Sequence, residues 1–130
     1  MPVTEIKNVH FKPGQTLTVK AVPHADATRI SLNICYSEQD IALHVNPRFD
    51  NNTVLCNACQ KGCWGEEVYG KGFPFARGVA FTITVTFLPE EFLVALPDDS
   101  LIYFPNRLRA TDYPNFFSKG ELSIESFEIK

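Results

Sequence analysis

The stretch FTITVTF, residues 81–87, carries an apolar side chain at every odd position and a threonine at every even position. A β-strand sends successive side chains to opposite faces, so this alternation predicts a strand with one buried and one exposed face. Similar short runs, rich in Val, Ile, Thr and Phe, recur along the chain between Pro, Gly, Asn and Asp residues. We predict strands over residues 3–11, 16–19, 30–35, 41–48, 54–57, 64–69, 81–87, 92–96, 101–104 and 122–129.

About ten strands at this close spacing are typical of an all-β sandwich. The apolar residues change parity between Ile124 and Phe127, which predicts a β-bulge near Glu125 or Ser126. No segment keeps a helical period, and at most one turn of helix is expected at residues 109–115. The 130 residues are enough to bury a core, and no repeat or linker divides them. We therefore predict one antiparallel β-sandwich domain spanning residues 1–130.

The charge and hydropathy of the chain exclude several classes of function. Its 12 basic and 15 acidic residues give a net charge of -3, which argues against a nucleic-acid-binding protein. No run reaches the ~20 apolar residues of a membrane span, and the N-terminus is charged where a signal peptide would be apolar. Four cysteines without a signal peptide are expected to be reduced thiols in the cytoplasm. Secretion by an unconventional route to the extracellular space stays open.

Polar residues gather between residues 44 and 67. His44, Asn46 and Arg48 occupy alternate positions of one predicted strand, so they are expected to stand side by side on one face. Ile41, together with the apolar residues at 43 and 45, is expected to point to the other face. A row of polar side chains on a sheet surface indicates a shallow binding site.

A neutral ligand with many hydroxyl groups needs a flat apolar plate and several fixed polar groups. Tryptophan supplies such a plate, because its ring face attracts polarised C–H groups. Asparagine both donates and accepts hydrogen bonds, glutamate accepts them, and arginine donates through a rigid fork. A misplaced hydroxyl would leave a buried polar group unpaired, at a cost of about 1–3 kcal/mol. Six residues meet this specification: His44, Asn46, Arg48, Asn57, Trp64 and Glu67.

Each of these residues also has an ordinary structural explanation. A strand histidine is more often a surface or core residue than a ligand contact, and a lone tryptophan is usually part of the core. Asn57 could occupy a turn. Arg48 and Glu67 could form a surface ion pair worth about 0–1 kcal/mol. The combination, rather than any single residue, favours a binding site.

Three cysteines have a spacing that resembles a metal site, C-x2-C-x3-C at Cys56, Cys59 and Cys63. A structural zinc ion takes four ligands, and the nearest further candidate is Cys35 or a distant histidine. We expect no metal ion and no cofactor. Cys56 should pack on the strand face opposite Asn57, whereas Cys59 and Cys63 lie in a predicted loop and are the thiols most open to oxidation outside the cell.

The sequence gives no support for catalysis. Glu66 and Glu67 are adjacent and would face opposite ways, so they cannot flank a glycosidic bond as a pair of acids. Motifs for a serine or cysteine nucleophile are absent from the sequence. We predict a binding protein rather than an enzyme.

Several ordered motifs resemble the signature of the galectins. They are HVNPRF at residues 44–49, NTVLCN at 52–57 and WGEE at 64–67, and the stretches FPF at 73–75 and FPNR at 104–107 are similar to further parts of that family. The likeness extends from about residue 6 to residue 129. It implies a β-sandwich of the jelly-roll type, with the site on the concave sheet. It also implies binding of β-galactosides without a metal ion.

The resemblance also implies a role for each of the six polar and aromatic residues. His44, Asn46 and Arg48 would hold the axial 4-hydroxyl of galactose. Asn57 and Glu67 would hold its 6-hydroxyl, and the tryptophan would stack on its apolar face. The arginine and the glutamate would also reach the 3-hydroxyl of the next sugar. The expected partners are galactose-terminated glycans and glycoproteins.

The chain departs from the galectin pattern in two places. Tyr69 stands where galectins usually have an arginine that braces the glutamate and helps contact the second sugar. The stretch between Arg48 and Asn57 is several residues shorter, and Asp50 is its nearest acidic residue. We therefore treat Asp50 and Tyr69 as candidate contacts to a second sugar.

Two interpretations of function follow from this comparison. The first is a lectin that cross-links glycoconjugates as a homodimer, pairing through its terminal strands at residues 3–11 and 122–129, because avidity requires two sites per particle. The second is a galectin-like structural or protein-binding module with weakened or altered sugar binding, which the two departures motivate.

Overall fold

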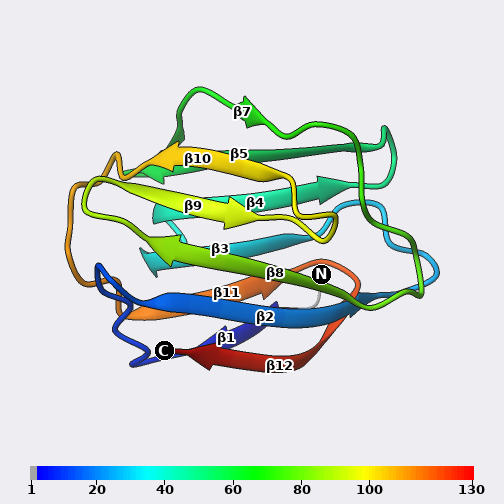
Figure 1. Cartoon of the computed structure of the whole chain (residues 1–130), viewed down its shortest axis with the longest axis horizontal. Coiled ribbons are helices and arrows are strands. Elements are labelled where there is room, and N and C mark those ends of the chain that lie inside the picture. Colours follow the sequence, from blue (N-terminus) through cyan, green and yellow to red (C-terminus); the bar gives the residue numbers. More distant parts are fainter. Residues whose placement is uncertain (1–2) are drawn as a thin grey trace.

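Two antiparallel sheets face one another in the computed structural model, which describes residues 3–130 (Figure 1). The seven-stranded sheet runs β1 (Val3–Ile6), β11 (Asn115–Lys119), β3 (Ser31–Ser37), β4 (Asp40–Arg48), β5 (Thr53–Gln60) and β6 (Cys63–Trp64), with β7 (Val68–Tyr69) also paired to β5. The five-stranded sheet runs β10 (Leu101–Pro105), β9 (Glu91–Ala95), β8 (Phe81–Phe87), β2 (Thr16–Pro23) and β12 (Leu122–Ile129). The expected all-β sandwich is confirmed. Over these residues no helix is long and apolar enough to cross a membrane.

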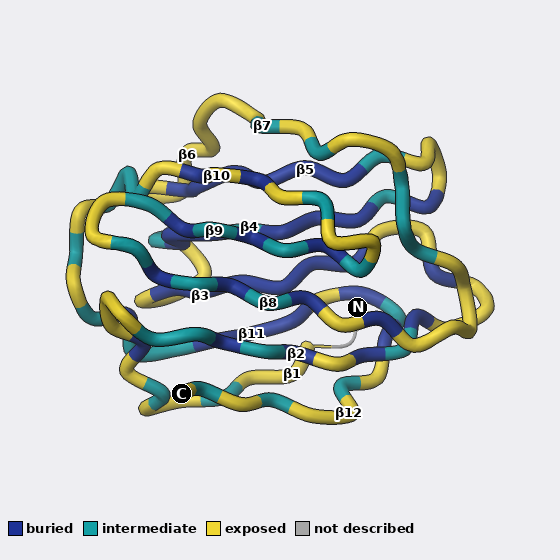
Figure 2. The backbone as a smooth tube through the Cα atoms, in the orientation of Figure 1, coloured by how far each residue is buried: buried dark blue, intermediate teal, exposed yellow. Residues whose placement is uncertain are grey.

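The core lies between the two sheets and is formed by the alternating apolar residues. The odd-numbered residues of β8 are all buried, whereas its threonines are exposed or partly exposed. Leu43 and Val45 of β4 enter the same core from the opposite sheet. Figure 2 shows the buried backbone of both sheets in dark blue. Because one face of each sheet is used for the core, the other face of the seven-stranded sheet, here called the outer face, is left to carry polar side chains.

Two β-bulges adjust which side chains reach each face. The predicted bulge near Glu125 is confirmed, because the register of β12 against β2 shifts between Ile124 and Ser126. A second bulge lies in β4, where Ile41 pairs with Cys59 and His44 pairs with Asn57. The extra residue reverses the alternation, so Ile41 shares the face of His44. The expectation that Ile41 points to the core with Leu43 is therefore wrong.

The bulge in β4 creates a small apolar cluster on the outer face. Ile41 packs there with Cys35, Cys59 and Phe117, apart from the main core. Phe117 belongs to β11, a strand that the sequence pattern did not predict. Its neighbour Phe116 enters the main core, so both faces of β11 are buried and no alternation of polar and apolar residues appears.

Three further expectations differ from the structure. The first strand ends at Ile6, and Phe11 makes only an isolated bridge to Tyr113. The expected strand over residues 64–69 is divided between β6 and β7. The turn of helix allowed at residues 109–115 does not form; this stretch is a bend that leads into β11.

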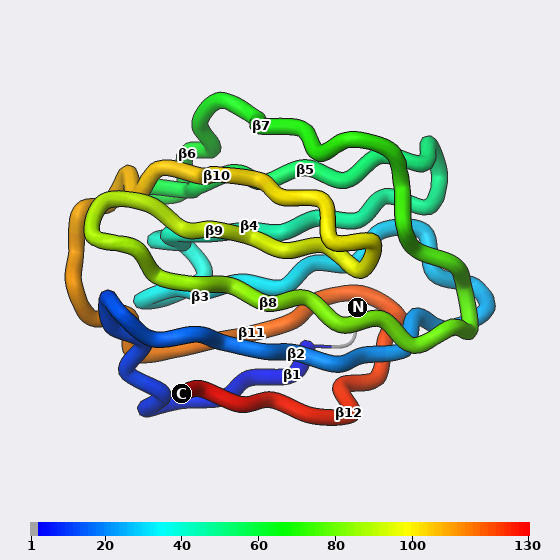
Figure 3. The backbone as a smooth tube through the Cα atoms, in the orientation of Figure 1, coloured from blue at the N-terminus to red at the C-terminus, as the bar shows by residue number. Residues whose placement is uncertain are grey.

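The two terminal strands lie at sheet edges. β1 ends the seven-stranded sheet and β12 ends the five-stranded sheet. Figure 3 shows both strands, blue and red, along the same lower border of the molecule. Each therefore has one side that makes no strand pairing within the described chain.

Candidate functional site

A hollow of about 530 Å³ opens on the outer face of β4 and β5, next to the loop that joins β6 to β7. The pairing of His44 with Asn57 brings the two strands' polar side chains together. Five of the six residues expected in the binding site line this hollow, and Asn46 lies buried beside Arg48. The lining residues are His44, Arg48, Leu55, Asn57, Trp64, Gly65 and Glu67.

His44 presents one ring nitrogen as a hydrogen-bond acceptor. Its Nδ1 lies 2.6 Å from Oδ1 of Asn33, whose Nδ2 donates to Oγ of Ser31 and to the carbonyl of Phe117. The Asn33 oxygen must therefore accept, so Nδ1 of His44 carries the proton and Nε2 is free to accept. Burial, and secondly the nearby Arg48 guanidinium, lower the pKa of His44 to about 4 from 6.5. At neutral pH the ring is uncharged and can bind a hydroxyl donor.

A chain of hydrogen bonds fixes Arg48 in front of the sheet. Nδ2 of Asn46 donates to the carbonyl of Ile30 at 2.8 Å, and Nε of Arg48 donates to Oδ1 of Asn46 at 2.9 Å. Nη2 of Arg48 donates to Oε2 of Glu67 at 3.3 Å. The guanidinium is thus held from two directions while its remaining N–H groups stay available. The polar groups of the site are arranged before any ligand arrives.

Trp64 forms a plate at the rim of the hollow. It is 51% exposed, and its ring centroid lies 4.5 Å from that of His44 with an angle of 53° between the planes. The explanation of a lone tryptophan as a core residue is excluded by this exposure. An exposed indole face above fixed hydrogen-bonding groups is suited to a ligand with one apolar and one polar side.

The amide of Asn57 is fixed in one orientation. Its Nδ2 donates to the carbonyl of Gly65 at 3.0 Å, and its Oδ1 accepts from the backbone N–H of Ala58 at 2.8 Å. Asn57 lies in the middle of β5, so the explanation of this residue as a turn residue is wrong. Its second N–H remains available to a ligand.

Arg107 holds this part of the site from behind, and sequence reasoning did not single it out. Its Nη1 donates to Oδ1 of Asn57 at 3.2 Å and its Nη2 to the carbonyl of Glu66 at 2.8 Å. Its guanidinium lies 4.6 Å from the ring centroid of Phe104. A Cβ on Gly65 would lie 2.9 Å from Nη1, so a larger residue there would require the Arg107 side chain to shift. The resemblance of residues 104–107 to galectins was the only signal in the sequence.

Leu55 is a second lining residue that the sequence did not reveal. It is buried on β5, opposite Asn46 of β4 and Tyr69 of β7. From the sequence alone, an apolar residue within a strand is normally assigned to the core. The pairing of β5 with β4 and β7 shows that Leu55 lies at the floor of the hollow.

The two candidate second-sugar residues lie in different surroundings. The Tyr69 hydroxyl donates to Oε1 of Glu67 at 2.7 Å, and this hydrogen bond raises the pKa of the phenol, so it stays a donor at neutral pH. Asp50 instead pairs with Nε of Arg29 at 3.1 Å. Arg29 forms an isolated backbone bridge with Arg48, the last residue of β4. Asp50 therefore lies past the Arg48 end of the strand that carries the polar residues of the site.

The four cysteines are all free thiols, and three of them are buried. Burial raises the pKa values of Cys35 and Cys56 to about 12. Cys56 enters the main core, as expected. Cys59 was expected in a loop but lies buried in β5, because the strand continues to Gln60 before it turns. Across residues 3–130 no three His, Cys, Asp or Glu side chains come together as metal ligands.

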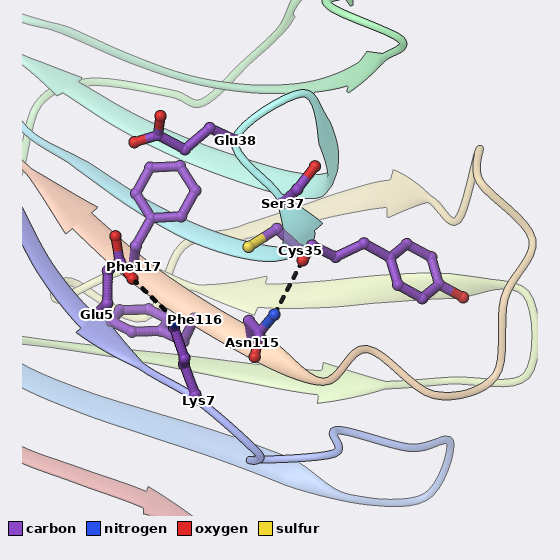
Figure 4. A pocket seen from close by; sticks show the side chains of 9 residues that line it. Glu5, Lys7, Cys35, Ser37, Glu38, Asn115, Phe116 and Phe117 are labelled. Carbon is purple, nitrogen blue, oxygen red and sulfur yellow. Dashed lines mark hydrogen bonds and ion pairs between the residues drawn. The ribbon is translucent and has the colours of Figure 1, made fainter.

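A smaller hollow of about 220 Å³ lies over β1, β11 and the end of β3 (Figure 4). Its floor includes Cys35 and Phe117, and the Glu38 side chain stands above the Phe117 ring in Figure 4. Nδ2 of Asn115 donates to the carbonyl of Tyr36 at 2.9 Å on one side. None of the six residues expected in the sugar site lines this hollow.

Comparison with known proteins gives a consistent result. Residues 2–129 match the family model described as "Galactoside-binding lectin". The chain is 46% identical to the beta-galactoside-binding lectin of Electrophorus electricus, and the match covers 95% of each chain. It is 37% identical to galectin-2 of Mus musculus, over 97% of this chain and 96% of the relative.

Solved structures resemble the chain equally closely. The crystal structure of Dario rerio galectin-1-L2 superposes with a TM-score of 0.93 at 46% identity, covering 98% of this chain and 99% of that one. Congerin II with lactose and MES bound superposes with a TM-score of 0.93 at 30% identity. The match covers 99% of this chain and 100% of that one. The similarity therefore extends over the sandwich and over the strands that carry the hollow.

Proposed function

Because the chain belongs to the galactoside-binding lectin family, the galectins, we propose that it binds β-galactosides such as lactose and N-acetyllactosamine-type glycans without a metal ion. The observation that carries the proposal is the side-by-side placement of a free His44 Nε2 acceptor and the exposed face of Trp64, whose rings lie 4.5 Å apart. Galactose offers both partners, since its axial 4-hydroxyl leaves one ring face with only C–H groups.

The proposed contacts follow from the donors and acceptors of the hollow. The 4-hydroxyl donates to Nε2 of His44 and accepts from the guanidinium of Arg48. The 6-hydroxyl accepts from Asn57 and donates to Glu67. Glucose, with an equatorial 4-hydroxyl, would leave the histidine and the arginine unpaired, at a cost of about 1–3 kcal/mol for each group. The preference for galactose is therefore expected to come from a penalty on the wrong epimer.

Retention on lactosyl-agarose tests this proposal. The folded protein should bind the resin and elute with lactose, whereas sucrose at the same concentration should not release it. Elution by both sugars would indicate a non-specific matrix interaction. Failure of the folded protein to bind would favour a galectin-like structural or protein-binding module.

We also propose that the protein cross-links glycoconjugates as a homodimer. The terminal strands β1 and β12, each at the edge of a sheet, support this proposal, because an unpaired strand edge is a template for pairing with a second chain. Thr16 and Lys130 exchange two backbone hydrogen bonds, so the N–H of the adjacent Ile129 points away from β2. Two weak sites in one particle would then bind a multivalent surface with avidity.

We propose that the protein acts by binding alone and that it resides in the cytoplasm, with export to the extracellular space by an unconventional route. Glycoside cleavage needs two carboxyl groups about 5–10 Å apart on either side of the bond, and Glu67 is the one carboxylate among the residues that line the hollow. Four free thiols suit a reducing compartment.

A further inference from the structure

The smaller hollow of about 220 Å³, here called the β11 hollow, opens beside β1, β11 and the end of β3 (Figure 4). Cys35 and Phe117 form its apolar floor; both are buried and belong to the small cluster on the outer face. Pockets for drug-sized ligands measure about 300–1,000 Å³, so this hollow suits a smaller molecule. One aromatic ring is enough to cover the floor.

Two carboxylate side chains line the β11 hollow near the Phe117 ring. Glu5 is the direct strand partner of Phe117 in the pairing of β1 with β11, and Glu38 stands above the ring in Figure 4. Burial raises the pKa of the Cys35 thiol to about 12, and the charges of Glu5 and Glu38 contribute to this rise, so the field of both carboxylates reaches the floor. An aromatic ring beside two negative charges attracts an organic cation.

An ammonium group of the chain itself already uses part of this arrangement. Nζ of Lys119 lies 5.9 Å from the centroid of the Phe117 ring and 3.9 Å from Oε1 of Glu38. Both distances are at the long end of the range for such contacts, and the lysine and glutamate side chains are about half exposed. An exposed ion pair of this kind contributes little to stability. Lys119 therefore marks the ring as a place for a cation without closing it.

Glu5 has an equally loose partner. Nζ of Lys7, which also lines the hollow, lies 4.0 Å from Oε2 of Glu5, and both side chains are exposed. Water competes for each of these lysines. A ligand that carries an ammonium group on a ring would exchange one such contact for another and would also remove the apolar floor from water, which favours its binding.

We propose that the β11 hollow binds a small aromatic amine in its protonated form: the ring packs on Phe117 and Cys35, and the ammonium group takes the place of Lys119 and faces the carboxylates of Glu38 and Glu5. This site is separate from the galactose hollow and does not depend on the proposed sugar binding. The preferred ligands are primary amines joined to one aromatic ring by a short chain. Neutral molecules of the same shape bind more weakly.

Titration of the isotope-labelled protein with 2-phenylethylamine, followed by NMR at neutral pH, tests the proposal. The backbone amide signals of residues 35–38 and 115–119 should shift, with a dissociation constant of about 1 mM, as expected for so small a ligand. 2-Phenylethanol, which has a hydroxyl in place of the ammonium group, should bind at least about tenfold more weakly. Nα-acetyl-lysine methylamide, which has the charge without the ring, should bind at least about threefold more weakly.

Two charge variants test the roles of the side chains. Glu38→Gln removes one carboxylate and should lower the affinity for 2-phenylethylamine by about two- to tenfold. Lys119→Gln removes the competing ammonium group and should raise this affinity by about twofold or more. Glu128→Gln and Lys130→Gln are the matched controls, because these residues form a similar exposed ion pair, at 3.4 Å, near the C-terminus. Both controls should bind the amine like the parent.

The outcomes separate this inference from the proposed function. Shifts confined to residues 44–67, or release of the amine by lactose, would place the amine in the galactose hollow and overturn the proposal. Equal affinity for 2-phenylethanol, tighter binding of the lysine derivative, or weaker binding of the amine by Lys119→Gln would also overturn it. A protein that binds the amine at the β11 hollow but does not bind lactose would support this inference and overturn only the proposed function.

Discussion

Nη1 of Arg107 donates to Oδ1 of Asn57 at 3.2 Å, across a gap of 50 positions in sequence. This bond joins the chain that follows β10, in the five-stranded sheet, to the middle of β5 in the other sheet. Together with the bond from Nη2 to the carbonyl of Glu66, it ties the β6–β7 loop to the sandwich. The loop that carries the tryptophan and the glutamate of the site is thus braced by a residue that is not among those lining the hollow.

Removal of this brace should weaken sugar binding. Arg107→Met removes the donor to the Glu66 carbonyl and one of the two donors to Oδ1 of Asn57, and we expect lactose affinity to fall by about tenfold, or about 1.4 kcal/mol, in calorimetric titration. Arg107→Lys, which restores one donor, should recover part of the loss. Arg77→Met is the matched control, because Arg77 also donates to a backbone carbonyl and covers a phenylalanine ring, away from the site. Equal loss of affinity in both methionine variants would contradict this role.

The Trp64 plate should be necessary for binding but not for folding. Since its side chain is 51% exposed, Trp64→Ala should change the free energy of unfolding little. Retention on lactosyl-agarose should be lost, because an aromatic contact is worth about 0.5–1.5 kcal/mol beyond the area it buries. Tyr103→Ala, which removes an equally exposed ring from the other sheet, should be retained like the parent. Persistence of binding in Trp64→Ala would show that the hollow has been assigned wrongly.

Lactose binding should be lost in acid, in the range where His44 takes up a proton. Its pKa is lowered to about 4 by burial and by Arg48, so binding should be constant between pH 8 and pH 6 and should fall as the pH approaches about 4. Titration of the His44 ring by NMR follows its protonation directly. A decline of binding that is complete by pH 6 would contradict the neutral acceptor.

The same lowered pKa affects stability. The unfolded chain binds the His44 proton near pH 6.5 and the folded protein only near pH 4, so the unfolded state gains protons first. The free energy of unfolding should therefore fall as the pH drops from about 6.5 to about 4, and this contribution should level off below that. Denaturant unfolding across this range, with His44→Gln as the comparison, measures the contribution; equal slopes in both proteins would contradict it.

One thiol should react much faster than the other three. Cys63 is exposed, whereas burial raises the pKa values of Cys35, Cys56 and Cys59. Iodoacetamide at pH 8 should therefore modify Cys63 in the folded protein and the others only after unfolding. Mass spectrometry of peptides from a time course gives the four rates, and Cys63→Ser should abolish the fast one. Comparable rates at Cys59 and Cys63 would contradict the burial of Cys59.

Dimerisation through β12 should be sensitive to a proline at a single position. The N–H of Ile129 points away from β2, so Ile129→Pro removes an edge donor and keeps the ladder within the chain. Ile129→Ala, which loses the side chain but keeps the N–H, is the control. In sedimentation at tens of micromolar, the parent and the alanine variant should be dimers and the proline variant a monomer. A monomeric parent would refute the proposed dimer.

The sequence predicted the parts of the molecule that depend on local pattern. The alternation of His44, Asn46 and Arg48 indicated their common face, and the strands of the five-stranded sheet follow their apolar residues. What the sequence did not reveal depends on contacts between distant segments. Arg107 and Asn33 act through residues of other strands, Leu55 resembles an ordinary core residue, and β11 is buried on both faces, which hides its alternation.

The position of the hollow within the seven-stranded sheet has a consequence for the proposed dimer. The hollow lies at β4 and β5, at the far side of the sheet from β1. If two protomers join by their β1 edges, neighbouring strands about 4.8 Å apart would place the two β5 strands about 40 Å from each other on one continuous face. A dimer of this kind would hold its two binding sites at a fixed separation. A glycan with closely spaced galactose branches would occupy one site only, and a bridge would form between separate carriers held about that distance apart.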